Sequence, residues 1–123
     1  MEQRYLIDTN IIIYHLNGMP EASMFIDNNF KKISISFVTY IEVLSFTFEN
    51  KEIELEVKKF LNLLKIIKMN NDIIEKTIDI RKKTKIKLPD AIIAATAEIE
   101  NITLVTRNIK DFKSLDINFI NIF

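Results

Sequence analysis

The spacing of apolar and polar residues along the chain separates segments that favour strands from segments that favour helices. Residues 33–36 alternate apolar and polar side chains, and residues 4–8, 66–69, 103–106 and 118–122 are short, mostly apolar runs. These five segments are expected to be strands. Helices are predicted over residues 21–30 and 51–64, and others are expected to begin near Thr9-Asn10, Ser36, Asn70 and Leu88.

The predicted strands alternate with helices, so the chain is expected to form a mainly parallel sheet with helices on both faces. This is a three-layer α/β/α fold. The 123 residues and 48% hydrophobic content suit a single domain over residues 1–123. One Gly and two Pro leave no flexible linker between two domains.

The composition excludes several classes of protein. Cysteine is absent, so neither a disulfide framework nor a thiolate metal site is expected. The first apolar stretch meets Asp8 too early for a signal peptide, and no run approaches the roughly 18–20 apolar residues of a membrane span. A soluble, cytoplasmic protein without a membrane partner is therefore expected.

The balance of charge gives weak support to a nucleic-acid partner. The net charge is +0, whereas nucleic-acid binders often carry excess positive charge. Basic residues nevertheless gather at residues 81–87 and again at Arg107, Lys110 and Lys113. Charge runs of this kind are usually solvated helix faces.

Acidic and amide side chains follow several predicted strands or begin the helices after them. Asp8 ends the first strand, Glu42 follows the second by about two helical turns, and Asp90 lies in the first turn of a later helix. Asn108 and Asp111 follow the fourth strand. Ligands of open α/β sheets bind beyond the carboxyl ends of the strands. Because clustered carboxylates repel one another, such a set favours a bound cation, and oxygen ligands without Cys or clustered His favour Mg²⁺ or Mn²⁺.

The order of these motifs resembles that of a PIN domain over essentially the whole chain. The matching segments are Asp8-Thr9-Asn10, Thr39-Tyr40-Ile41-Glu42-Val43, residues 88–97 (LPDAIIAATA), and Val105-Thr106-Arg107-Asn108 followed by Asp111-Phe112. The resemblance implies a four- or five-stranded parallel sheet between helices, with an acidic metal site. It also implies a VapC-type toxin ribonuclease, the toxin of a type II toxin–antitoxin pair.

The resemblance assigns metal-binding and catalytic roles to individual acids. Asp8, Glu42 and Asp90 match the three most regular acidic ligands of the family. The fourth position is open between Asp111, which we favour, and Asn108, which offers a carbonyl oxygen without charge. Asn108 then acts as a polar supporting residue.

Other residues near the motifs have weaker assignments, each with an ordinary structural alternative. Candidates for orienting ligands or water, or simply for capping and packing, are Thr9, Asn10 and Thr106. Candidates for holding an RNA backbone, or simply for solvation, are Lys82, Lys83, Lys85 and Arg107. The single histidine, His15, is expected to be structural. Aromatic residues expected in the core, or in contact with a helix of a partner, are Phe37, Tyr40, Phe46 and Phe48.

The function implied by the resemblance is a Mg²⁺-dependent endoribonuclease, with Mn²⁺ as an alternative ion. Hydrolysis of RNA would leave a 5′-phosphate and a 3′-hydroxyl. The implied partners are RNA, a cognate antitoxin whose segment lies near the acidic site, often with an Arg, and a second copy in a homodimer. The alternative is a PIN fold that binds protein or RNA without catalysis, supported by Asn108 and the neutral net charge.

Overall fold

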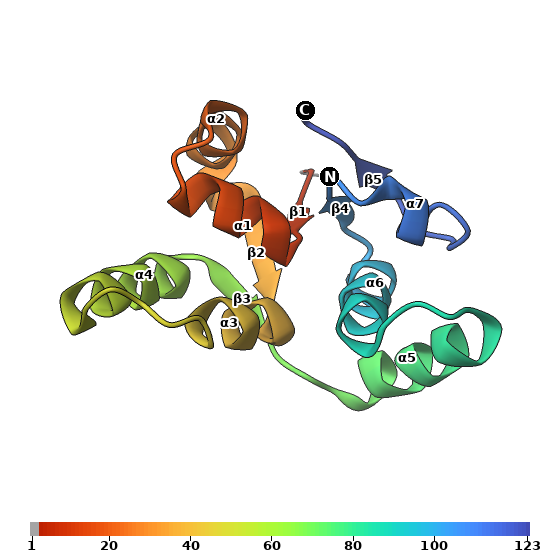
Figure 1. The fold of residues 1–123 in the computed structure, drawn as a ribbon. Helices are drawn as coiled ribbons and strands as arrows, with labels where there is room; N and C mark the ends of the chain where they lie inside the picture. The colour runs from red at the N-terminus through yellow and green to blue at the C-terminus, as the bar shows by residue number, and fades with distance from the viewer. Residues whose placement is uncertain (1–2) are drawn as a thin grey trace.

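In the computed structural model, which describes residues 3–123, five parallel strands form one sheet and helices cover both of its faces (Figure 1). The strands are β1 (Tyr5–Ile7), β2 (Ile33–Ser36), β3 (Lys65–Ile67), β4 (Thr103–Val105) and β5 (Phe119–Ile120). The α-helices are α1 (Thr9–Leu16), α2 (Pro20–Asn29), α3 (Phe37–Leu44), α4 (Lys51–Leu63), α5 (Asn71–Lys83), α6 (Leu88–Glu100) and α7 (Ile109–Phe112), and a short 3₁₀ helix, η1, spans Phe30–Lys32. None of the helices within residues 3–123 has the length and apolar character needed to cross a membrane.

The strand order is β3-β2-β1-β4-β5, so the chain builds outward from β1 in two directions. Strand β1 pairs with β2 on one side, with Leu6 opposite Ser34, and with β4 on the other, with Leu6 opposite Leu104. The strand order therefore reverses between β1 and β4, and open α/β sheets place their ligand sites at such a reversal. The expected three-layer, parallel α/β/α fold is confirmed.

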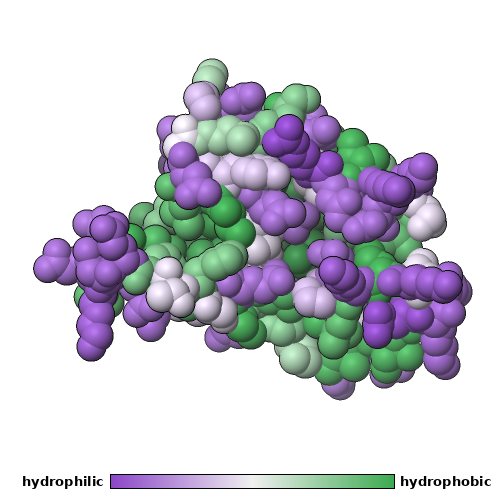
Figure 2. Space-filling view, viewed as in Figure 1, coloured by the Kyte–Doolittle hydropathy of each residue, from purple (hydrophilic) through white to green (hydrophobic). Residues whose placement is uncertain are grey.

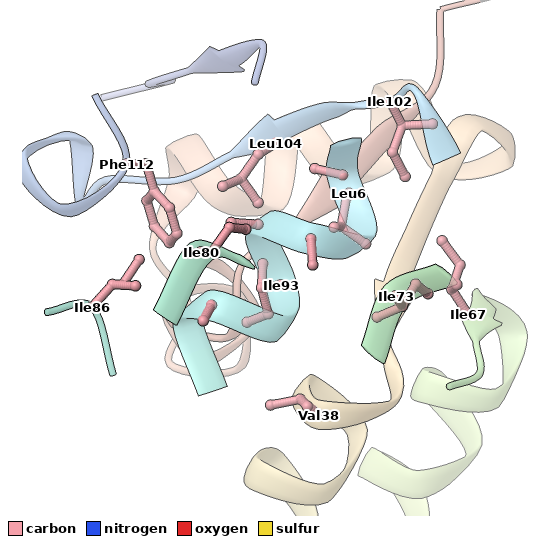
Figure 3. Packing of buried hydrophobic residues seen from close by; sticks show 14 residues of the cluster. Leu6, Val38, Ile67, Ile73, Ile80, Ile86, Ile93, Ile102, Leu104 and Phe112 are labelled. Atoms are coloured by element: carbon pink, nitrogen blue, oxygen red, sulfur yellow. The ribbon is translucent and has the colours of Figure 1, made fainter. Parts of the chain in front are cut away.

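Two hydrophobic clusters pack against opposite faces of the sheet. Leu6 and Ile7 are adjacent and fully buried, but they belong to different clusters because successive strand side chains point to opposite faces. Leu6 and Leu104 meet Ile93 of α6 in one layer (Figure 3). Burying each such side chain stabilises the fold by roughly 1.5–3 kcal/mol.

Side-chain caps explain where several helices begin. Asn50 accepts a hydrogen bond from the Ile53 backbone N–H at α4, and Asn70 accepts one from the Ile73 N–H at α5. Helix α6 begins with Pro in its first turn, where the missing N–H costs nothing. The small buried residues of α6 let this helix lie close to the sheet and α5: Ala91, Ala94, Ala95 and Ala97.

Several predicted boundaries differ from the structure. The first strand was expected over residues 4–8, but it ends at Ile7, and Asp8, rather than Thr9-Asn10, caps α1. The third strand occupies residues 65–67 instead of 66–69, and the fifth only residues 119–120 instead of 118–122. The short helix α7 is not among the predicted helices. Strand ends are set by where the neighbouring strand stops pairing, which a local pattern does not contain.

Candidate functional site

Asp8 stands at the reversal of strand order, immediately after β1. Its backbone N–H donates to Val105 O at 3.0 Å, which extends the pairing of β1 with β4 by one bond. Asp8 is only 4% exposed. Oδ1 accepts from the Thr9 backbone N–H at 2.8 Å, and Oδ2 accepts from Thr106 Oγ1 at 2.9 Å. Both carboxylate oxygens are therefore held, and the group cannot turn away from the carboxyl end of the sheet.

Burial determines the acidity of Asp8. Burial raises the pKa of Asp8 above its ordinary value, while hydrogen bonds from Thr106 and Thr9 oppose that change and the Glu42 charge adds to it. The two donors stabilise the ionised form in a position where burial disfavours it.

Glu42 is oriented by a chain of two threonine hydroxyls. Thr9 Oγ1 lies 2.7 Å from Glu42 Oε1 and donates to it, and Thr9 Oγ1 also lies 2.9 Å from Thr39 Oγ1. Thr9 has one hydroxyl hydrogen, and it donates that hydrogen to the carboxylate. In the second hydrogen bond Thr39 must therefore be the donor and Thr9 the acceptor. Thr39 is not among the predicted site residues, although its position three residues before Glu42 places both on one face of α3.

Asp90 lies in the first turn of α6, and the charges of the other three acids act on it. Its pKa is raised to about 6, first by burial and then by the charges of Asp8, Asp111 and Glu42, while Lys87 opposes these effects. The four predicted acids therefore come from four separate parts of the chain and lie close enough together for their charges to repel one another.

Asn108 and Asp111 contact each other, so the two candidates for the fourth position are not independent. Asn108 Nδ2 donates to Asp111 Oδ2 at 2.6 Å, and the Asn108 backbone N–H donates to Thr106 Oγ1 at 2.9 Å. Thr106 is fully buried and donates its own proton to Asp8. A continuous chain of hydrogen bonds thus connects Asp8 with Asp111.

The donors of this cluster are of the type that a hard divalent cation prefers. All are oxygen atoms, and the ion pairs described within residues 3–123, Arg4–Glu100 and Lys76–Glu98, involve none of the four acids. As the side chains stand, no three His, Cys, Asp or Glu residues in this part of the chain are arranged to hold a metal ion. The chemistry of the set fits a hard divalent cation, but the side chains must converge further to bind one.

The remaining predicted residues lie around the cluster in different settings. Asn10 is exposed. His15 bonds Ser23 through Nδ1 at 2.8 Å, and its ring lies 4.9 Å from that of Phe60, a structural setting in which burial lowers its pKa. Arg107 is exposed, and its guanidinium lies over the rings of Tyr14, at 5.5 Å, and Phe123, at 4.7 Å.

The basic stretch at the end of α5 and directly after it contributes to two surface hollows. Lys82, Lys83 and Lys85 are all exposed. Lys83 lines a hollow that also contains the acids Asp79, Glu98 and Asp116. Lys85 lines a different hollow together with Asp111. Hydrophilic residues are frequent on this side of the molecule, with hydrophobic residues between them (Figure 2).

An apolar groove of about 530 Å³ lies on the other side, between α1, α3 and α4. It includes Leu16, Phe46, Phe48 and Ile53. Phe46 is 54% exposed, which agrees with the alternative that some of these aromatic residues lie at the surface and not in the core. Phe37, Tyr40 and Phe48 are half-buried and pack against the hydrophobic clusters.

Comparisons with protein families, with individual proteins and with solved structures all indicate the same family. The model of the PIN domain matches residues 5–118. Ribonuclease VapC2 of Rickettsia felis is 32% identical over 124 residues, which cover 90% of this chain and 91% of that protein. A chain in the structure of a toxin–antitoxin complex from Klebsiella pneumoniae is 34% identical, with a TM-score of 0.84 over 97% of this chain and 98% of that one. A chain of VapBC2 from Rickettsia felis, bound to a DNA fragment from its promoter, is 27% identical, with a TM-score of 0.84 and the same coverage.

Proposed function

The chain belongs to the PIN-domain family, and on this premise we propose that it is a metal-dependent endoribonuclease, the toxin of a type II toxin–antitoxin pair. The observation that carries the proposal is the convergence of Asp8, Glu42, Asp90 and Asp111 at the carboxyl end of the sheet. Burial and the charges of the other three acids raise the pKa of Asp90 to about 6. A protein gains nothing in stability from four mutually repelling carboxylates, so their convergence is explained best by a cation that neutralises them.

The ion that fits this set is Mg²⁺, with Mn²⁺ as the alternative, because every candidate donor is an oxygen. Asp8, Asp90 and Asp111 would hold it, and Glu42 would either bind it or position the attacking water. A bound Mg²⁺ activates water as a nucleophile and neutralises charge that develops on the phosphate. Binding would require the carboxylates to lie closer together than they do in this structure.

The protein's own contribution is to orient the carboxylates before metal and RNA arrive. Thr106 and the Thr9 backbone N–H fix the two oxygens of Asp8, and the Thr9 hydroxyl directs one oxygen of Glu42. Asn108 holds Asp111 from outside the cluster. Such fixed orientation lowers the cost of assembling the reacting groups. Attack in line with the leaving oxygen would leave a 5′-phosphate and a 3′-hydroxyl.

The partner that fits the toxin role is an antitoxin, and the apolar groove is the surface that suits it. Exposed Leu16, Phe46 and Ile53 present side chains that water disfavours, and a large apolar area at the surface of a soluble domain usually marks an interaction site. Similar chains occur in a toxin–antitoxin complex. We propose that an apolar segment of the antitoxin occupies the groove, and that the toxin forms a homodimer as the family resemblance implies.

The experiment is RNA cleavage by the wild type and by Asp8→Asn, each with Mg²⁺ and with EDTA, followed by sequencing of the product ends. We expect cleavage only by the wild type with Mg²⁺, and a folded variant by circular dichroism. If folded Asp8→Asn cleaves at the wild-type rate, the assignment of the site is wrong. If the wild type neither binds Mn²⁺ in a calorimeter nor cleaves RNA, the non-catalytic PIN module becomes the better description.

A further inference from the structure

A polar hollow of about 330 Å³ adjoins the acidic cluster. Two segments distant in the sequence form it: the connection from α5 to α6 supplies Thr84, Lys85 and Lys87, and α7 supplies Lys110. Asp111 also lines this hollow, so the hollow and the acidic cluster share one side chain. The two features are therefore neighbouring parts of one surface.

The charge of this hollow is strongly positive within a neutral chain. Lys85, Lys87 and Lys110 are exposed and line the hollow, while Asp111 is the acid among its described lining residues. None of the three lysines takes part in an ion pair described within residues 3–123. Lys87 also lies close enough to Asp90 to oppose the rise in the pKa of that acid. Three like charges around one hollow suit an anion as the occupant.

Buried anchors hold the lysines in place. Ile86 is only 8% exposed and belongs to the cluster that includes Phe112 (Figure 3), so the lysines on either side of it project outward. The Ile86 carbonyl accepts from Arg81 Nη1 at 2.6 Å, and its N–H donates to Thr84 Oγ1 at 3.3 Å. Fully buried Phe112 anchors α7, which carries Lys110. The backbone that presents the positive charges is therefore fixed before a ligand binds, which reduces the entropic cost of binding.

The neighbouring hollow also contains lysines but has no excess of positive charge. There Lys83 stands among Asp79, Glu98 and Asp116, and Lys76 pairs with Glu98 at 3.2 Å. In that hollow, acidic side chains of the protein balance the positive charge. In the hollow beside Asp111, one acid stands among three lysines, so most of the positive charge is available to bind an anion.

We propose that Lys85, Lys87 and Lys110 hold a backbone phosphate of single-stranded RNA next to the bond that is cleaved. This inference rests on the proposed function for the identity of the ligand, because the ligand must extend from the acidic cluster into the hollow. A phosphate there orients the strand and supplies no sequence preference, since the contacts reach the backbone and not the bases. Lys87 and Lys110 are additions to the RNA contacts expected from the sequence, and Lys85 is retained.

The test is binding of a fluorescent single-stranded RNA of mixed sequence, in EDTA, measured by anisotropy at several salt concentrations. The variant replaces all three lysines: Lys85→Gln, Lys87→Gln and Lys110→Gln. The control replaces three exposed lysines elsewhere, with the same change in net charge: Lys31→Gln, Lys58→Gln and Lys59→Gln. All six side chains are exposed, so both proteins should melt like the wild type.

We expect the site variant to bind RNA at least about tenfold more weakly at low salt. The negative slope of log K against log salt should become about 2 units less steep, because three phosphate contacts contribute roughly 0.7 each. The control should keep the wild-type slope. Single-stranded DNA of the same sequence should lose affinity by the same factor, because the contacts are to phosphate.

The outcomes separate this inference from the proposed function. Equal losses in site variant and control, or no RNA binding by the wild type, would overturn the lysine site even if the wild type cleaves RNA with Mg²⁺. A selective loss in the site variant supports the lysine site even if no cleavage is detected. If cleavage is detected, the site variant should show a raised KM with an unchanged kcat, because a flanking phosphate contact binds ground state and transition state alike.

Discussion

Thr9 Oγ1 donates a hydrogen bond to Glu42 Oε1 at 2.7 Å. This bond connects a residue on α1 with a carboxylate on α3. The same hydroxyl must accept from Thr39, which is fully buried. The direction of both bonds follows from the single proton of Thr9. The orientation of Glu42 thus depends on how α1 and α3 pack together and not on α3 alone.

Replacing Thr9 by Val should lower RNA cleavage by roughly 10–100-fold, the usual cost of losing a residue that orients a metal ligand. Val keeps the branched shape but has no hydroxyl to donate to Glu42. Thr9→Ser keeps the donor and should retain most activity. Steady-state cleavage of a labelled RNA with Mg²⁺ measures the difference. Equal activity of the Val and Ser variants would show that the bond to Glu42 is dispensable.

Replacing Asp90 by Asn should stabilise the protein in EDTA at neutral pH. The folded-state pKa of Asp90, about 6, lies above its ordinary value of 3.8, so the folded protein holds this proton more tightly than the unfolded chain. The free energy of unfolding therefore decreases as pH rises between these values, and the full cost of ionisation is present above about 6. Allowing for screening of a half-exposed group, the gain for the Asn variant is about 1 kcal/mol.

Urea unfolding in EDTA at pH 7.5 and pH 5 checks this prediction, and the gain should shrink at the lower pH. Exposed Asp116→Asn is the matched control and should change little at either pH. Adding Mg²⁺ should stabilise the wild type and not Asp90→Asn, since a ligand stabilises only the state that binds it. Destabilisation by Asp90→Asn in EDTA would contradict the electrostatic explanation.

The fourth ligand can be assigned by comparing substitutions at Asp111 and Asn108. Asp111→Asn removes the charge that acts on Asp90, whereas Asn108→Ala removes a hydrogen bond to Asp111 and leaves the charge. We expect Asp111→Asn to weaken Mn²⁺ binding by more than tenfold, measured by calorimetry, and Asn108→Ala to weaken it less. The reverse order would make Asn108 the ligand.

Introducing a charge into the apolar groove should weaken antitoxin binding without affecting cleavage. Phe46 is 54% exposed and lines the groove, so Phe46→Glu should fold normally yet place a carboxylate where an apolar segment docks. We expect affinity for the purified cognate antitoxin to fall at least tenfold, about 1.4 kcal/mol. Leu63→Glu is the control, because Leu63 is 70% exposed on α4 and is not among the groove residues. Equal effects of both substitutions would exclude the groove as the specific docking surface.

Some of this protein could be predicted from the chain because the signals are local. The alternation of Ile33-Ser34-Ile35-Ser36 predicts β2, and Ser36 caps α3 as expected by accepting from the Val38 N–H. The order of strands and helices predicts the parallel three-layer fold, and the motifs around Asp8, Glu42 and Asp90 indicate the candidate acids. Periodicity and capping are short-range properties that a sequence carries directly.

Tertiary structure decided the relations between segments far apart in the sequence. Thr106 reaches Asp8 across 98 positions only because β1 and β4 pair in parallel, and Thr39 joins the site only because α3 packs on α1. Lys85 and Lys87 gather with Lys110 because Ile86 and Phe112 enter one core. Hydrogen bonds and repulsion between charges act over a few ångströms, so their partners depend on strand pairing and helix packing, which no local pattern contains.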